Sequence, residues 1–162
     1  MKTHRNKGPK GEPWAWLLAA LLVFGFSLPA LAALGGNMDS VEADRAHMQA
    51  EITVTQADAY ATHEIKAPSG TVVREYVSTD GRVFGVAWHG PFVPDMKQIL
   101  GAYFQQYSAA VQTAKAGHPG RRPLNIQQPG LVVQTSGHLR AYSGRAYDPS
   151  LVPQGVSTDA IR

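Results

Sequence analysis

Three short runs of alternating apolar and polar residues lie between residues 60 and 88. The runs read YATHEIK, TVVREYVS and RVFGVAW, and the turn residues PSG and TDG separate them. Alternation with a period of two indicates strands that bury one face. Asp80-Gly81 favours a two-residue hairpin turn, because both central positions of a type I′ turn need a positive φ. We therefore predict three consecutive antiparallel strands.

The same turn predicts which residues of the second and third strands lie opposite each other. The expected pairs are Val73 with Trp88, Glu75 with Val86 and Val77 with Phe84. Directly opposed residues share a face of the sheet. One face is then apolar apart from Glu75, and its members are Val73, Val77, Phe84, Val86 and Trp88. The other face carries Arg74, Tyr76, Ser78, Gly85 and His89.

Helical periodicity replaces this alternation after residue 94. Pro94 suits the first turn of a helix, and Asp95 places a favourable charge at its N-terminus. Gly117 and Pro119 end the pattern. Between these limits one apolar stripe recurs with helical spacing, formed by Met96, Ile99, Leu100, Tyr103, Phe104, Tyr107 and Val111. The pattern predicts a single long amphipathic helix.

Weaker patterns flank this core. The stretch LVVQTSGHLRAYSG predicts a second hairpin that turns around Ser136-Gly137, and residues 124–126 can add a short edge strand. Residues 33–57 are polar and thinly patterned, so we expect a weakly structured lead-in in which Asp39 could start a short helix. Residues 148–162 contain two prolines and little periodicity. We expect that segment to be a coil tail over the surface.

Together these elements predict an α+β fold for residues 58–147. It is an antiparallel sheet of about five strands, built from a meander, a long helix and a C-terminal hairpin. The amphipathic helix is expected to pack on one face of the sheet.

The N-terminal 32 residues have the pattern of a secretory signal peptide. Four basic residues precede WAWLLAALLVFGFSLPALAAL, which carries no charge. Pro29 breaks the helix before a small-residue cleavage site, which predicts processing between Ala32 and Ala33. The alternative is an uncleaved anchor, since 21 uncharged residues are long enough to span a bilayer. Both interpretations predict a periplasmic domain, and the first also permits secretion.

Charge and cysteine content exclude several classes of function. With four of the 15 basic and one of the 12 acidic residues in 1–32, 11 of each remain in the mature part. Nucleic-acid binding needs a clustered positive field, so we do not expect it. The chain has no cysteine. This excludes disulfides, a thiol nucleophile and a thiolate metal site.

Three long stretches resemble a known family. They are GTVVREYVSTDGRVFGVAWHGP, PDMKQILGAYFQQY and LVVQTSGHLRAYSGRAYDPSLVPQGV. They are similar to exported bacterial proteins grouped as domain of unknown function 2844, and the likeness extends from Ala33 to Val156. The resemblance implies a signal-bearing envelope protein of Gram-negative bacteria. It implies no activity and provides no catalytic residues.

Glu75 is the residue with the strongest physical argument for a special role. A carboxylate on an apolar strand face must be paired or have a raised pKa, because burying a lone charge costs several kcal/mol. One interpretation is a structural ion pair with Arg140, or a place near the sheet edge that reaches water. The other is a general acid or base held in an apolar pocket.

Other catalytic or metal sites are poorly supported by spacing. His63, His89 and His138 could all lie on strands, but none has the close spacing to another histidine that brings metal ligands together. We therefore predict no metal site and no cofactor. Ser69 and Ser136 lie at turn positions, and no nucleophile-elbow motif occurs. Serine hydrolysis is not indicated.

The stretch HLRAYSGRAY is the candidate binding surface. On one strand, His138, Arg140 and Tyr142 would share a face. Arginine beside tyrosine anchors many interfaces, through bidentate hydrogen bonds and cation–π contacts. Arg145 follows after Gly144, where we expect the chain to bend. The alternative is that these side chains only cover a half-exposed sheet and bind no ligand.

Two functions follow from these patterns. The first is a non-catalytic binding or accessory domain in the periplasm, with an unknown envelope protein or glycan as partner. The second is a small periplasmic hydrolase that uses Glu75 with a histidine. The lack of a recognisable catalytic set favours the first.

Overall fold

The computed structural model describes residues 34–117 and 123–162. Seven antiparallel strands form one sheet in the order β1-β2-β3-β4-β7-β6-β5. The strands are β1 (Glu51–Gln56), β2 (Tyr60–Lys66), β3 (Val72–Ser78), β4 (Val83–Gly90), β5 (Leu124–Gln128), β6 (Leu131–His138) and β7 (Ala141–Tyr147). The α+β class is confirmed, but the sheet has seven strands instead of about five.

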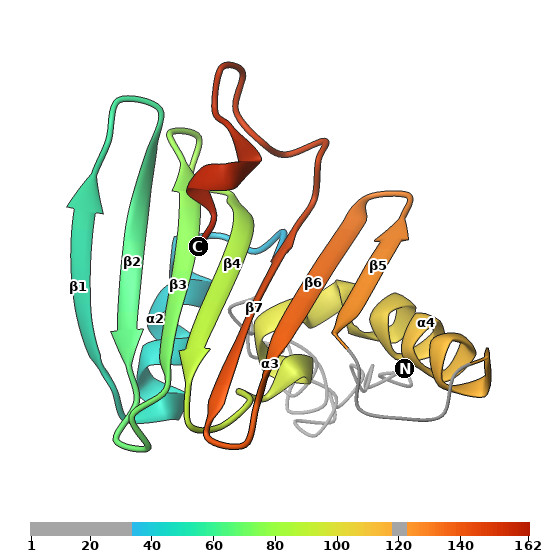
Figure 1. Ribbon diagram of the computed structural model, residues 1–162. Coiled ribbons are helices and arrows are strands. Elements are labelled where there is room, and N and C mark those ends of the chain that lie inside the picture. The colour runs from blue at the N-terminus through green and yellow to red at the C-terminus, as the bar shows by residue number, and fades with distance from the viewer. Residues whose placement is uncertain (1–33, 118–122) are drawn as a thin grey trace, which may run out of the picture.

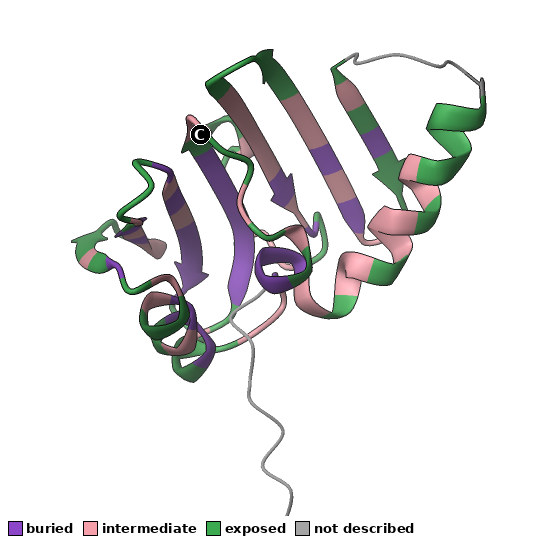
Figure 2. Cartoon of the chain, turned by 90° about the horizontal axis from the view of Figure 1, so that it is seen from below, coloured by how far each residue is buried: buried purple, intermediate pink, exposed green. Residues whose placement is uncertain are grey.

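Three helices lie on the same side of this sheet, as Figures 1 and 2 show. They are α2 (Met38–Met48), α3 (Met96–Leu100) and α4 (Phe104–Gly117). The predicted signal segment and its cleavage site between Ala32 and Ala33 lie outside the described residues. Within the two described ranges, no helix has both the length and the apolar character that crossing a membrane requires.

The prediction of a weakly structured segment over residues 33–57 is wrong. The Asn37 side chain caps α2 by accepting a hydrogen bond from the backbone N–H of Ser40. Leu34 and Val41 are each 1% exposed in the main core, although the segment contains few apolar residues. β1 then pairs with β2 along its whole length, with Ile52 opposite Ile65. A few well-placed apolar contacts and strand pairing order this polar stretch.

The predicted long helix is interrupted at Gly101. Asp95 caps α3, since its carboxylate accepts hydrogen bonds from the backbone N–H groups of Lys97 and Gln98. Gly101 has φ of 47°, which ends α3 and starts the short 3-10 helix η2 (Gly101–Tyr103) before α4. The break lets Ile99 and Leu100 insert into the core while α4 runs beside β5.

The hairpin between β3 and β4 contains a bulge that the sequence did not predict. Its loop is one residue longer than expected: the Ser78 N–H donates to the Arg82 carbonyl, and Gly81 has φ of 83°. Val77 therefore pairs with Val83, and Phe84 moves to the opposite face. Beyond the bulge, the predicted pairs Glu75 with Val86 and Val73 with Trp88 are confirmed.

The described part of the sheet has two cores, one on each face, and the bulge places Phe84 in the second. The main core, beneath the helices, includes Val73, Val86 and Trp88. The second core lies on the face that was predicted to be polar and contains Tyr76, Phe84, Ala87 and Ile161. Ile161 is fully buried, so the C-terminal segment supplies part of this second core.

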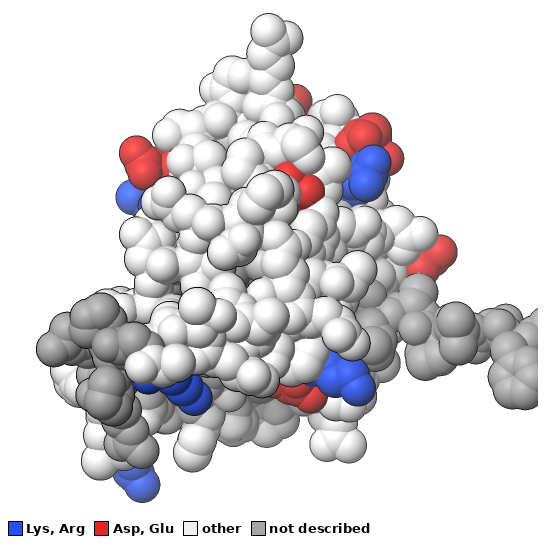
Figure 3. Space-filling model, turned by 90° about the vertical axis from the view of Figure 1, so that its right-hand side faces the viewer, with Lys and Arg blue, Asp and Glu red and all other residues white. Residues whose placement is uncertain are grey.

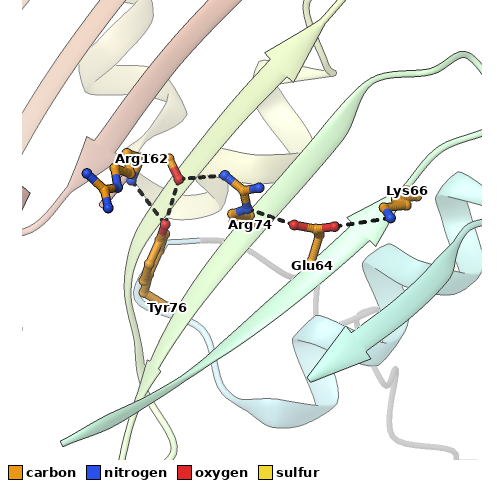
Figure 4. A network of polar contacts seen from close by, with 5 residues as sticks. All are labelled: Glu64, Lys66, Arg74, Tyr76 and Arg162. Atoms are coloured by element: carbon orange, nitrogen blue, oxygen red, sulfur yellow. Dashed lines mark hydrogen bonds and ion pairs between the residues drawn. The ribbon is translucent and has the colours of Figure 1, made fainter. Parts of the chain in front are cut away.

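Polar contacts hold the C-terminal segment on the second face (Figure 4). The Tyr76 hydroxyl donates a 2.8 Å hydrogen bond to the Arg162 carbonyl and accepts one from the Arg162 N–H at 3.0 Å. Arg74 also donates to that carbonyl, and its Nε lies 2.8 Å from a Glu64 carboxylate oxygen. The tail is therefore a fixed part of the fold, with one short 3-10 helix, η3 (Thr158–Ala160).

Candidate binding site

Trp88 forms the floor of a cavity on the helix-covered face. It lies on β4, directly opposite Gly144 of β7. A Cβ atom at position 144 would lie 2.2 Å from Cζ2 of the indole, so only glycine leaves room for the ring. Gly144 therefore lies within a regular strand, and the prediction that it bends the chain is wrong. The bare backbone lets the indole lie across β7.

The cavity has a volume of about 900 Å³ and lies between α4 and strands β5–β7. Tyr107 and Val111 of α4 form one wall, while Leu124 and Tyr142 of the sheet form the other. A cavity of this size with mainly apolar and aromatic walls is typical of small-molecule sites. The remaining lining residues are Trp88, Val93, Met96, Ala114, Lys115, Pro123, Asn125, Thr135, Ser136, Gly137, His138, Leu139 and Ser143.

Exposed apolar side chains surround one end of the cavity. Val93 is 50% and Leu139 is 77% exposed, and both line the cavity. Phe92, beside Val93, is 57% exposed. Gly90 pairs with Tyr142, which brings the loop after β4 next to the turn between β6 and β7. Large exposed apolar residues gathered at one place usually mark a contact surface.

The polar side chains of the lining are mostly uncharged and include no acidic group among the described residues. Among the lining residues within the described chain, Lys115 carries the only full charge, and no Asp or Glu is present. Lys115 lies in the last turn of α4. Figure 3 views the molecule from the side that carries α4 and β5, where most of the described surface is neither acidic nor basic.

The predicted face of His138, Arg140 and Tyr142 does not form. The hairpin turns at Leu139-Arg140, beyond the predicted Ser136-Gly137, so His138 pairs with Ala141. Arg140 has φ of 63° in the exposed turn and is absent from the described cavity lining. His138 and Tyr142 both line the cavity, at the ends of β6 and β7. The cavity thus contains two of the predicted binding residues but not Arg140.

Arg145, the fourth predicted binding residue, contacts the chain's own C-terminal segment. Its Nη1 donates to the Thr158 carbonyl at 2.9 Å and to the Ile161 carbonyl at 3.4 Å. Its Nε donates to Gln134 at 2.8 Å, and its guanidinium lies over the Tyr147 ring. These contacts occupy the side chain on the face opposite the cavity.

Glu75 does not pair with Arg140. It is fully buried in the main core, and neither of its carboxyl oxygens accepts a hydrogen bond from any described residue. Burial raises its pKa well above the ordinary value, and the nearby Asp44 carboxyl raises that pKa further. Asp44 of α2 is 1% exposed. The ion pair predicted for Glu75 is therefore replaced by a contact between two carboxyl groups.

A shared proton explains this contact. Asp44 Oδ1 accepts a 2.7 Å hydrogen bond from Gln98 Nε2, while Asp44 Oδ2 has no donor among the described residues. Burial raises the pKa of Asp44 to about 6, although its hydrogen bond with Gln98 opposes that change. A protonated Glu75 can donate to Asp44, which satisfies both groups.

The predicted histidine candidates are dispersed. His63 lies directly opposite Glu75 on β2 and is 4% exposed; burial lowers its pKa, and its Nδ1 has no partner among the described residues. His89 and His138 lie on β4 and at the end of β6. Across residues 34–117 and 123–162, no three histidine or acidic side chains are grouped as metal ligands would be.

Comparison with protein families places the chain in one family. The family described as Protein of unknown function (DUF2844) matches residues 30–161. The chain belongs to this family. The match includes the whole sheet, all three helices and the C-terminal segment, so the cavity lies entirely within the DUF2844 region. No curated protein and no solved structure shows a significant match.

Several site residues of this DUF2844 chain were not identified as such from its sequence. Trp88, Tyr107 and Val111 were predicted only as core, and they line the cavity. Asp44 and Gln98 were not singled out, because they come from a polar segment and from the polar side of a helix. The stripe of large aromatic residues on the helix was the available signal for the cavity wall.

Proposed function

We propose that this chain is an exported, non-catalytic binding protein of the cell envelope, and that its ligand occupies the cavity over Trp88. The signal-like segment of residues 1–32 supports export. The cavity of about 900 Å³ with apolar walls and an exposed apolar rim carries the binding part of the proposal.

The hydrolase alternative, which needs Glu75 with a histidine, has less support. Glu75 and His63, the histidine opposite it, are 0% and 4% exposed and do not line the cavity within the described chain, whereas His138 lines the cavity without Glu75. A general acid or base must come within hydrogen-bond reach of the substrate. A substrate would have to enter the packed core to reach either group.

A protein partner is the second candidate for the ligand. Val93 and Leu139 are both exposed at the rim, which suits an apolar side chain of an envelope protein. A glycan is less well matched, because its hydroxyls would face mainly apolar walls.

The export part is tested by expressing the tagged full-length chain in a Gram-negative host and fractionating the cells. We expect the protein in the periplasm, with an N-terminus at Ala33 by protein sequencing. A full-length chain in the inner membrane would favour the anchored form of the same proposal. A cytosolic chain with an intact leader would refute export.

The binding part is tested with the neutral apolar dye Nile red and the protein as the cell processes it. We expect dye fluorescence to rise with saturation, and Ala114→Trp to reduce binding by filling the cavity from an exposed position. Ala116→Trp, two residues further along the exposed side of α4, is the matched control. Equal binding by both variants would place the dye elsewhere and overturn the assignment of this cavity.

A further inference from the structure

The charge pattern of the cavity narrows the class of ligand, provided that the proposed binding function holds. Lys115 contributes one ammonium group, while the other lining residues within the described chain carry no carboxylate to neutralise it. Lys115 is exposed, and no ion pair to it is found among the described residues. An anionic group bound here would gain an attraction that a neutral or cationic group would not.

The apolar lining of the cavity continues from its walls to its exposed rim. Trp88 and Tyr142 line it on the sheet side, and Tyr107 and Val111 line it on the helix side. The exposed Val93 and Leu139 extend the apolar surface to the rim. A flexible hydrocarbon chain would cover both the walls and the rim, whereas a small compact ligand would leave the rim in water.

The rim is held in place without a ligand. The Thr71 hydroxyl donates a 3.0 Å hydrogen bond to the Phe92 carbonyl and fixes the loop that carries Val93. Gly137 has φ of 123°, and a Cβ there would lie 2.2 Å from the Ala141 carbonyl oxygen, so the adjoining hairpin end is closely packed. A rim fixed in this way lowers the ordering cost of binding.

We propose that the cavity binds a single-chain amphiphile with an anionic end group, of the long-chain fatty acid class. The hydrocarbon chain lies between Trp88 and the α4 wall, and the carboxylate pairs with Lys115. Double-chain lipids are disfavoured, because a cavity of about 900 Å³ is within the range of small-molecule sites.

Competition with a fluorescent fatty acid tests this class. The processed protein is loaded with dansylaminoundecanoic acid, which is then displaced by hexadecanoate, hexadecanol or hexadecylamine, all with the same chain length. We expect hexadecanoate to displace the probe at the lowest concentration and hexadecylamine at the highest. Equal displacement by all three amphiphiles would overturn the anionic class while leaving an apolar binding function intact.

Charge-reversed variants test the role of Lys115. We expect Lys115→Glu to weaken hexadecanoate binding by about three- to ten-fold, the range for one exposed ion pair and its reversal, and to leave hexadecanol unchanged. Lys97→Glu is the matched control, because Lys97 is exposed on α3 and outside the cavity. An equal loss in both variants would show that only the overall charge matters and would overturn the pairing with Lys115.

The cavity-filling variant separates failure of the ligand class from failure of the proposed function. If Ala114→Trp abolishes binding of every amphiphile, the site is correct whatever the order of the three competitors. If neither Nile red nor the fluorescent fatty acid binds the wild type, the proposed binding function and the ligand class both fail.

Discussion

The carboxyl groups of Asp44 and Glu75 lie close together inside the main core, although one belongs to α2 and the other to the inner strand β3. They replace the carboxylate–arginine pair that strand patterning predicted. Two buried carboxyl groups in contact cannot both be ionised without a large cost. We therefore expect the two groups to share a proton, which would join α2 to the sheet.

This arrangement predicts the direction in which pH changes stability. The folded-state pKa values of both groups are raised, that of Asp44 to about 6. Their contribution is fully present below their unfolded pKa values and is lost as pH rises through the folded ones. His63 acts in the opposite direction, since its lowered pKa makes its contribution fall as pH decreases.

Substitution Glu75→Gln isolates the carboxyl pair. The amide can still donate to Asp44 but does not ionise, so the variant should gain stability over the wild type as pH rises from 5 to 8. The gain should increase steadily over this interval, because the wild type has to ionise a buried carboxyl group that the variant lacks. Urea unfolding followed at several pH values measures the difference.

Glu64→Gln is the control for that experiment. The hydrogen bond from Arg74 lowers the pKa of Glu64. The Glu64 carboxylate therefore contributes to stability at neutral pH, and this contribution is lost in acid. The variant should lose at most about 1 kcal/mol near pH 7 and nothing in acid, as expected for a surface ion pair. A constant offset between Glu75→Gln and wild type at all pH values would mean that no shared proton exists.

The contact between Trp88 and Gly144 predicts a sharp effect of one methyl group. Gly144→Ala places a Cβ where the indole lies and should destabilise the protein by about 1–3 kcal/mol through overpacking. It should also move the ring and change Trp88 fluorescence. Thermal unfolding and emission spectra measure both effects.

A second substitution tests whether the contact with Trp88 causes the loss of stability in Gly144→Ala. In the background of Trp88→Phe, which has a smaller ring, adding Gly144→Ala should cost clearly less than it does alone, because contacting residues are not additive. Equal costs in the two backgrounds would indicate that alanine affects β7 through its backbone and not through Trp88.

The sequence predicted local pairing well and long-range partners poorly. Strand alternation placed Glu75 on the apolar face, and the predicted turn paired it with Val86 correctly because the bulge offsets the extra loop residue. It could not identify Asp44, which lies 31 positions earlier in a segment with few apolar residues. That segment folds because Leu34 and Val41 enter a core formed by distant strands, and no local pattern reports this.

The other differences between the sequence prediction and the structure come from turn positions. The extra loop residue at Gly81 moved Phe84 to the second core, so a face predicted to be polar became a packing surface for Ile161. The turn lies at Leu139-Arg140 instead of Ser136-Gly137, so β6 continues through His138 and Thr135 lies opposite Gly144. The cavity is lined by residues of α3, α4 and strands β4–β7. Its lining could be predicted only if the pairing register of each of these strands was known.

Arg145 is predicted to stabilise the C-terminal segment. Arg145→Gln removes its hydrogen bonds to the Thr158 and Ile161 carbonyls and should cost about 1–2 kcal/mol. The released segment should also become sensitive to carboxypeptidase. Arg140→Gln, in the exposed turn, is the matched control and should change neither property. Unchanged proteolysis of the Arg145 variant would show that Tyr76 and Arg74 suffice to hold the tail.

Two residues at the turn end of the β6–β7 hairpin predict substitution effects of opposite sign. Arg140 has φ of 63°, a left-handed conformation that disfavours residues with a Cβ, so Arg140→Gly should stabilise the protein by up to about 1 kcal/mol. Gly137→Ala should destabilise it by more than about 2 kcal/mol, because its Cβ would lie 2.2 Å from a carbonyl oxygen at φ of 123°. Thermal unfolding of both variants measures the two signs.

Arg140→Gly should also bind the fluorescent fatty acid like the wild type, since the Arg140 side chain does not line the described cavity. A large loss of binding would show that Arg140 belongs to the ligand site after all.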